Sequence, residues 1–347
     1  FTVTGAMADH RLRLQSSKIG GFLAALAKQL GVATSGLDKH AAAIGGNALA
    51  AKWVTAVAKD LTANKGKAVV VVGSRQPAYV HALAHLVNAS IAGDTVRYTR
   101  AFEEKFEAGL DSLKSLVADA SGDKVNTLII LGGNPVFDAP VDFRFQQALN
   151  KVPFRAHLSL YNDETSLQCH WHIPETHYLE TWGDARSHDG TVSIMQPLIA
   201  PLYNGRSAHE VLGSMLGGLD TSSYAAVRNY WFGRGATEAS WRKWLHDGVV
   251  ENTALPARGG SVAAPAPAQT APRAPGIELE IKLDPTLYDG RFANNSWLQE
   301  LPKPQTKITW DNVLLMGPRT ADSLGFGVDE RSTLFNELQT RIAEVEY

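Results

Sequence analysis

Two short glycine-containing segments stand where a parallel sheet could bind a ligand. Gly73, Ser74 and Arg75 follow the apolar run 68–72, and Gly132, Gly133, Asn134 and Pro135 follow the apolar run 127–131. Open α/β sheets bind ligands beyond the carboxyl ends of their strands, where glycines allow close approach and helix N-termini favour anions. Both segments are therefore candidate nucleotide loops, but neither has GxGxxG or P-loop spacing. Spacing alone favours a tight turn for Gly-Gly-Asn-Pro.

Histidines and the single cysteine gather in the next part of the chain. The group comprises Cys169, His170, His172, His177 and His188. Cysteine and histidine are good zinc ligands, but this spacing matches no standard zinc pattern, and a strand over 169–173 would point neighbouring side chains to opposite faces. His81 and His85 share one helix face without a third ligand nearby. The pattern favours histidines hydrogen-bonded to backbone or carboxylates, and it predicts no metal site.

Acidic residues and serines in the same region offer acid–base or nucleophilic chemistry. The carboxylates are Asp163, Glu164, Glu175, Glu180, Asp184 and Asp189. Raised pKa values there would support proton transfer, but carboxylates in polar loops are usually solvated. Ser159 and Ser193 lie in no nucleophile-elbow motif. The sequence therefore predicts no catalytic residue.

The elements that would position these residues alternate between helix and strand. Apolar spacing predicts helices over 16–30, 48–61, 77–86, 110–117 and 141–149. Apolar or alternating runs predict strands over 68–72, 95–98, 127–131 and 154–160. Such alternation indicates βαβ units, and hence an α/β fold with a doubly wound, mainly parallel sheet.

The pattern changes after residue 161. Residues 170–205 favour irregular structure with short hairpins, and helices resume over 208–216 and from 224 and 238. Residues 255–276 are rich in alanine and proline, which is typical of a linker. Strict alternation over 277–283, together with 313–316, predicts a smaller β-rich second domain. The expected division is 1–254, a linker over 255–276, and a truncated domain over 277–347.

Composition excludes several function classes. Among 347 residues, 33 basic and 35 acidic side chains give a net charge of −2, which provides no field for nucleic acid. One cysteine excludes an internal disulfide, a four-cysteine zinc site, and an iron–sulfur cluster held by this chain alone. Aliphatic runs are far shorter than the roughly 20 residues of a membrane span, so we expect no direct membrane insertion. Both ends look cut, which suggests a piece of a longer protein.

Several segments together resemble one family. They are 4–12, 131–135, 161–165, 169–175, 177–185, 189–199, 294–301 and 310–312. They resemble the molybdopterin-oxidoreductase-like subunit of bacterial alternative complex III, a Tat-exported, iron–sulfur-containing, hydrogenase-like protein. The string Cys-His-Trp-His-Ile-Pro-Glu over 169–175 is its most specific part, and the Gly-Asn-Pro turn is weaker.

The resemblance implies a role in respiratory electron transport. The parent would lie at the periplasmic face of the bacterial cytoplasmic membrane, in a complex that oxidises quinol. Its molybdopterin-type half would be a scaffold without molybdenum, followed by a half that carries iron–sulfur clusters. In relatives that bear the cofactor, loops matching 73–75 and 132–135 hold the pterin nucleotide.

This chain departs from a working molybdoenzyme. Cys169 does not match the position of a molybdenum ligand, and the cluster-binding cysteines are absent. We therefore expect a cofactor-free scaffold that contacts the cluster-bearing half of its parent and other subunits of the complex. Two alternatives remain: an oxidoreductase that binds molybdopterin guanine dinucleotide at the two loops, and a nucleotide- or metal-binding module.

Overall fold

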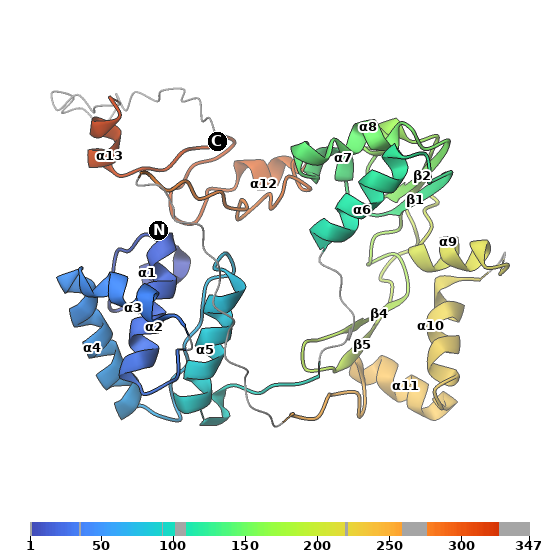
Figure 1. Ribbon diagram of the computed structural model, residues 1–347. Coiled ribbons are helices and arrows are strands. Elements are labelled where there is room, and N and C mark those ends of the chain that lie inside the picture. The colour runs from blue at the N-terminus through green and yellow to red at the C-terminus, as the bar shows by residue number, and fades with distance from the viewer. Residues whose placement is uncertain are drawn as a thin grey trace. The chain divides into compact units, whose positions relative to one another are not determined.

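The computed structural model describes residues 2–34, 36–91, 93–100, 109–218, 221–258 and 276–325 (Figure 1). The chain divides into two compact units. The larger comprises residues 9–281, and the smaller combines residues 1–8 with 282–347.

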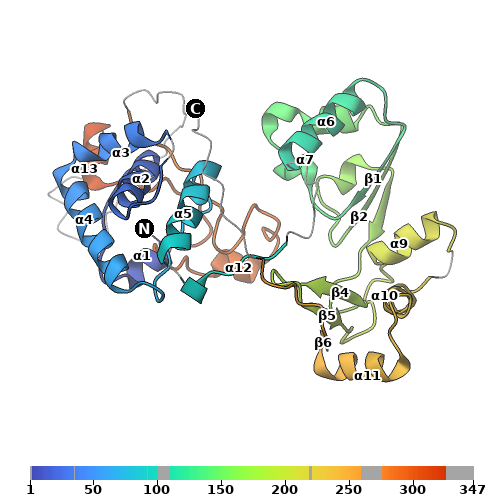
Figure 2. The same ribbon diagram turned by 60° about the horizontal axis from the view of Figure 1, so that its bottom comes forward.

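A helical bundle opens the larger unit (Figure 2). Its helices are α2 (Ile19–Gln29, preceded by a 3-10 turn at Ser16–Lys18), α3 (Asp38–Gly45), α4 (Ala48–Ala63) and α5 (Ala78–Ile91). Leu23 and Leu26 of α2 are buried with Ile44 and Leu83, as their helical spacing predicts. A Cβ at Gly21 would lie 2.6 Å from the His40 carbonyl oxygen, so the contact between α2 and α3 requires a glycine.

The strand expected over 68–72 is not part of any sheet in the described residues, so this expectation is corrected. Both backbone groups of Val70 bind the Asn88 carboxamide: its N–H donates to Oδ1 and its carbonyl accepts from Nδ2, each at 2.8 Å. A side chain thus occupies the place of a neighbouring strand along this edge. The strand expected over 95–98 is also wrong, since Thr95 ends a 3-10 turn (Gly93–Thr95) and 96–98 enter no ladder.

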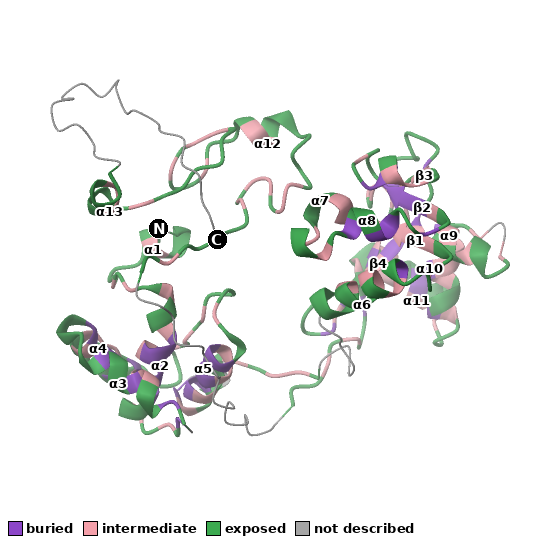
Figure 3. Cartoon of the chain, turned by 45° about the horizontal axis from the view of Figure 1, so that its top comes forward, coloured by how far each residue is buried: buried purple, intermediate pink, exposed green. Residues whose placement is uncertain are grey.

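A three-stranded parallel sheet forms the next part. Its strands are β1 (Thr127–Leu131), β2 (Phe154–Ser159) and β3 (Trp171–Pro174), in the order β1-β2-β3. Thr127 pairs with Phe154, and Ala156 pairs with Trp171. The central strand β2 is the most buried (Figure 3), and its last four residues are buried on both faces. The predicted strands over 127–131 and 154–160 are thereby confirmed.

Helices α6 (Gly109–Ser121), α7 (Pro135–Asp138) and α8 (Phe145–Leu149) accompany this sheet. Ala120, Ala148 and Val152 form a small core against which Leu128 of β1 packs. The single helix expected over 141–149 is wrong in detail. Arg144 has a φ of 51° and separates a 3-10 turn (Val141–Phe143) from α8.

A second, antiparallel sheet confirms the short hairpin expected within 170–205. It contains β4 (Gly183–Arg186), β5 (Val192–Met195) and β6 (Val249–Val250), in the order β4-β5-β6. The predicted helices are α9 (Ala208–Met215), α10 (Ser223–Phe232) and α11 (Glu238–Asp247). Val192, Ile194, Trp231 and Trp241 belong to the core that joins this sheet to its helices.

The C-terminal part of the chain does not show the expected β-rich structure within its described residues. Residues 277–283 and 313–316 form no strand, and an isolated bridge joins Asp284 to Tyr288. The helices of the smaller unit are α1 (Val3–Met7), α12 (Ser296–Glu300) and α13 (Pro318–Ser323). Most of the expected linker, and the part of the expected C-terminal domain after residue 325, lie outside the described residues.

The fold as described is mixed α/β, with one parallel and one antiparallel sheet. Each helix in the described ranges is too short or too polar to cross a bilayer.

Candidate functional site

The candidate site lies at the carboxyl end of the parallel sheet, as the sequence predicts for the second loop. Gly132 and Gly133 directly follow β1, and both have positive φ angles, 69° and 72°. These angles favour glycine because a Cβ would be strained there. Pro135 then begins α7, and the N–H that proline lacks is not needed at the first helical position.

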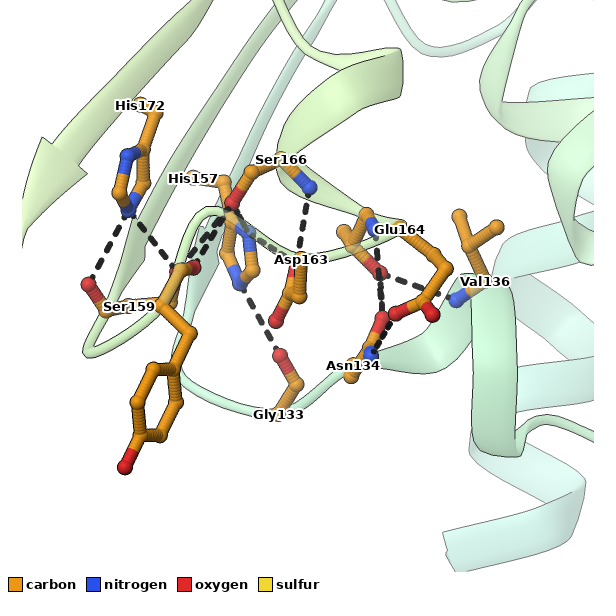
Figure 4. Close-up of polar contacts among 11 residues, drawn as sticks. Gly133, Asn134, Val136, His157, Ser159, Asp163, Glu164, Ser166 and His172 are labelled. Atoms are coloured by element: carbon orange, nitrogen blue, oxygen red, sulfur yellow. Dashed lines mark hydrogen bonds and ion pairs between the residues drawn. The ribbon is translucent and has the colours of Figure 1, made fainter. Parts of the chain in front are cut away.

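The Asn134 side chain crosses from this loop to the loop after β2 (Figure 4). Its Oδ1 accepts hydrogen bonds from the Thr165 N–H (3.2 Å) and the Thr165 hydroxyl (2.8 Å). Its Nδ2 donates to Glu164 Oε2 at 2.7 Å. Thr165 is fully buried, and its hydroxyl oxygen accepts in turn from the Val136 N–H at 3.0 Å. Asn134 therefore acts as a tie between two loops, and its side chain makes no capping bond to α7.

His157 of β2 lies at the centre of the same network. It is fully buried, with Nε2 at 3.0 Å from the Gly133 carbonyl oxygen and Nδ1 at 2.8 Å from the Ser166 hydroxyl (Figure 4). A carbonyl can only accept, so Nε2 carries the proton and Nδ1 accepts from Ser166 when the ring is neutral. Burial lowers the pKa of His157, while the Asp163 carboxylate, 3.5 Å away, opposes this shift. The ring is thus held neutral as a structural bridge.

Ser159 and His172 form a contact that resembles a nucleophile and its base. The Ser159 hydroxyl lies 3.2 Å from His172 Nε2 but donates to the Tyr161 carbonyl at 2.7 Å. His172 Nε2 also lies 3.1 Å from the Ser159 carbonyl oxygen, which requires the proton to be on that nitrogen. His172 therefore cannot accept the serine proton, and the pair does not form an activated nucleophile.

Two carboxylates border the glycine loop. The hydrogen bond from Asn134 holds the pKa of Glu164 below its ordinary value, so this group is ionised at neutral pH. A Cβ at Gly132 would lie 3.9 Å from Glu175 Oε2, which places that half-buried carboxyl against the loop. Burial raises the pKa of Glu175. Among the described residues neither glutamate forms an ion pair.

The first candidate loop has a different setting. Gly73, Ser74 and Arg75 follow the unpaired 68–72 segment, and the Gln76 N–H closes a turn onto the Gly73 carbonyl at 3.0 Å. Gly73 has no positive φ, and a Cβ there would meet no atom within 4 Å. The Arg75 guanidinium lies 3.5 Å from a carboxylate oxygen of Glu280. This loop is therefore an ordinary turn attached to the helical bundle.

The histidines of the Cys-His segment bind backbone and hydroxyl groups, as their spacing favours. His170 Nδ1 accepts from the Arg155 N–H at 3.1 Å. Outside this segment, His85 of α5 has its Nδ1 3.2 Å from the Tyr98 hydroxyl. Burial raises the pKa of the Cys169 thiol, which keeps it protonated. Within the described ranges no three histidine, cysteine or carboxylate side chains converge as metal ligands do.

The remaining acidic candidates have structural partners. Asp184 Oδ2 accepts from the Trp231 indole at 2.8 Å, Glu180 accepts from the His177 N–H, and Asp189 binds Ser187 and Thr191 within a turn. Ser193 is exposed on β5. Sequence reasoning missed His157 and Ser166, although a histidine within the apolar run of β2 was a readable signal; Thr165 entered only through the resemblance, within the segment 161–165.

Comparison with known proteins gives one partial match. No family model matches the chain. Over 112 residues it is 30% identical to the "Menaquinone reductase, molybdopterin-binding-like subunit" of Nitratidesulfovibrio vulgaris. The match covers 30% of this chain and 16% of that relative. The chain is therefore similar over part of its length to a molybdopterin-binding-like subunit.

Proposed function

We propose that this chain is part of a molybdopterin-oxidoreductase-like subunit of a respiratory electron-transfer complex, and that it acts there as a scaffold without its own redox cofactor. The partial identity to a menaquinone reductase subunit supports the oxidoreductase relationship. The finer proposal is a quinol-oxidising complex of the alternative complex III type, at the periplasmic face of the membrane. The partners would be a cluster-bearing half of the same parent chain and further subunits.

The internal bonding of the 132–135 loop is the observation that carries the scaffold proposal. A pterin nucleotide would need hydrogen-bond donors from this loop for its phosphates. The Gly132 N–H instead donates to the Leu158 carbonyl at 2.8 Å, and the Asn134 amide donates to Glu164. Two of the loop's donors are thus already used within the protein.

Charge at the loop opposes the same ligand. The ionised Glu164 carboxylate lies 2.7 Å from Nδ2 of Asn134 in the loop, and the Glu175 carboxyl borders Gly132. Like charges repel, so the ionised Glu164 disfavours a bound anionic group at this loop. The residues present therefore do not fit molybdopterin guanine dinucleotide at this loop.

The 73–75 loop adds no compensating site. Its one cationic group, Arg75, lies 3.5 Å from Glu280. No atom lies within 4 Å of a Cβ placed at Gly73, so the turn does not require a glycine there. Both loops therefore favour a vestigial role over cofactor binding. The proposal also includes the fold: the parallel sheet belongs to a doubly wound, mainly parallel sheet of the molybdopterin-oxidoreductase type.

Metal and pterin analysis of the purified chain tests the scaffold role. We expect molybdenum and oxidised-pterin fluorescence far below one equivalent per chain. Stoichiometric molybdenum with pterin would overturn the proposal in favour of a cofactor-binding oxidoreductase. Stoichiometric zinc, or a thermal shift with nucleotides, would instead favour a metal- or nucleotide-binding module.

A further inference from the structure

We propose that Asn204 is a site of spontaneous covalent modification, at which the asparagine becomes aspartate or isoaspartate and the end of β3 loses the segment that pairs with it. The reacting pair is Asn204 and Gly205, in the loop before α9, and it is the one Asn-Gly sequence in the chain. This chemistry is independent of the proposed function, since no cofactor and no partner takes part in it.

The reaction proceeds best where an asparagine precedes a residue without a side chain. The backbone nitrogen of Gly205 attacks the side-chain carbonyl carbon of Asn204, its proton passes to solvent base, and ammonia leaves as a five-membered succinimide closes. Water then opens the succinimide at either carbonyl, which gives aspartate or isoaspartate. Glycine has no Cβ to crowd the attacking nitrogen, so Asn-Gly is the most reactive sequence for this chemistry.

The fold itself favours both residues of this pair. Asn204 has a φ of 53°, in the left-handed region where asparagine is enriched among residues that carry a side chain. A Cβ at Gly205 would lie 3.1 Å from the Pro174 carbonyl oxygen and 3.2 Å from the Thr176 nitrogen. The backbone conformation and this close contact with the end of β3 thus favour an Asn-Gly sequence despite its reactivity.

The reacting groups are not engaged in other bonds within the described ranges. The Asn204 side chain is exposed and makes no hydrogen bond to any residue there, and the Gly205 N–H donates none. Water and solvent base therefore have access to the side chain, and no side-chain bond has to break before the reaction.

A short bridge nevertheless holds the loop in a conformation that prevents ring closure. The Arg206 N–H donates to the Pro174 carbonyl at 2.8 Å, and the Thr176 N–H donates to the Arg206 carbonyl at 3.1 Å. In the left-handed region the next backbone nitrogen lies nearly opposite the side chain across the Cα–C bond, so the Gly205 nitrogen cannot reach the Asn204 carboxamide. Ring closure therefore requires the bridge to open and the peptide after Asn204 to rotate.

Isoaspartate makes this opening permanent. It adds one carbon atom to the main chain between residues 204 and 205, and Gly205 is already packed against the end of β3. The two hydrogen bonds of the bridge are then lost. The bridge flanks Glu175, whose carboxyl borders Gly132, so the modification loosens one side of the candidate site.

Site-resolved mass spectrometry of the full chain, incubated at mildly alkaline pH, tests the modification. We expect Asn204 to deamidate about 10- to 100-fold more slowly than in a synthetic peptide of residues 201–207, because two hydrogen bonds must open first. Asn252 is the matched internal control, since it is exposed and has a φ of 59° but is followed by Thr253. It should react at least about tenfold more slowly than Asn204, because a β-branched side chain crowds the nitrogen.

Two results of this experiment would overturn the proposal. Deamidation at Asn204 that is no faster than at Asn252 would show that the loop is not a modification site. A rate equal to that of the peptide would show that the bridge does not hold the loop closed.

Amide hydrogen exchange before and after the incubation tests the loss of the bridge. We expect the Thr176 amide to exchange at least about tenfold faster in the isoaspartate fraction, separated by chromatography. The Glu175 amide is the control, because it donates to the Ser159 carbonyl at 2.9 Å within the sheet. Asn204→Gly tolerates the positive φ and cannot deamidate, so it should keep slow exchange at Thr176 after the same incubation. Unchanged exchange at Thr176 in the isoaspartate fraction would contradict the loss of the bridge.

Discussion

The Asn134 carboxamide oxygen lies 2.8 Å from the hydroxyl oxygen of Thr165, and this bond ties the loop after β1 to the loop after β2. Thr165 is fully buried, so its polar groups depend on partners within the protein. The 132–135 loop, a candidate nucleotide loop by its sequence, is thus bonded to the loop after β2. If the network is structural, substitutions within it should change the free energy of unfolding.

Replacement of Asn134 by alanine should destabilise the protein. The change removes the acceptor for the Thr165 hydroxyl and N–H and leaves a buried donor unsatisfied, which costs about 1–3 kcal/mol. Urea unfolding measures the loss of unfolding free energy as a lower midpoint with an unchanged m-value. Asn150→Ala is the matched control, because its exposed side chain should change stability by less than about 0.5 kcal/mol. Equal effects of the two variants would contradict the role of Asn134 as a tie.

The lowered pKa of His157 should make the free energy of unfolding depend on pH. Its pKa in the folded protein is below the ordinary 6.5 because burial penalises the charged ring. The unfolded state therefore takes up a proton near pH 6.5 while the folded state does not, so the free energy of unfolding falls as pH decreases below that value. The slope for one group is at most about 1.4 kcal/mol per pH unit.

The variant His157→Gln isolates this contribution. It removes the titrating ring, so its unfolding free energy should fall less between pH 7 and pH 5 than that of the unchanged protein. His188→Gln, at an exposed position, is the matched control for the substitution itself. If His157→Gln keeps the full slope, the ring is not held neutral by its surroundings.

From Glu175 we expect the opposite pH dependence: its contribution to the free energy of unfolding falls as pH rises. Its pKa is raised by burial, so its charged form is disfavoured in the folded protein at neutral pH. The group contributes most favourably below its unfolded pKa, and that contribution is lost as pH rises through the folded pKa. Glu175→Gln should therefore increase the melting temperature at pH 7, and the gain should shrink as pH falls toward 4.5. A variant that is less stable than the unchanged protein at pH 7 would show that the carboxylate has a favourable partner.

The sequence could predict which runs have strand-like patterns, but not which of them pair into a sheet. The runs 68–72 and 127–131 look alike in sequence, but only the second is paired in the described structure. Periodicity reports which residues face a core, while pairing depends on a neighbour distant in sequence. The Asn88 carboxamide, 18 residues from Val70, substitutes for such a neighbour, and no local pattern reveals that.

The alternation over 277–283 misled for a related reason. Glu278 and Glu280 contact the helical part through side chains, Glu278 at Ser17 and Glu280 at Arg75, and no ladder forms. At the candidate site, the Gly-Gly-Asn-Pro turn and its positive φ angles follow from residue types. The partners of His157 do not, because Gly133 lies beside the ring through the pairing of β1 with β2, and Ser166 through the fold of the loop after β2.

Two tryptophans in the antiparallel-sheet core allow a test of hydrogen bonding at nearly constant volume. Trp231 is 6% and Trp241 1% exposed, and both belong to the same cluster. The Trp231 indole N–H donates to Asp184 at 2.8 Å, whereas the buried Trp241 N–H has no partner among the described residues.

Phenylalanine at either position removes a similar volume, so the difference between the two variants reports the hydrogen bond. Trp231→Phe leaves the Asp184 carboxylate without its donor, while Trp241→Phe removes an N–H that was already unsatisfied. We expect Trp231→Phe to cost about 1–3 kcal/mol more than Trp241→Phe, although Trp241 is the more buried residue. Asp184→Asn in the Trp231→Phe background should then add little, because the two changes share one interaction. A larger loss at Trp241, in denaturant unfolding of both variants, would show that packing outweighs the indole–carboxylate bond in this core.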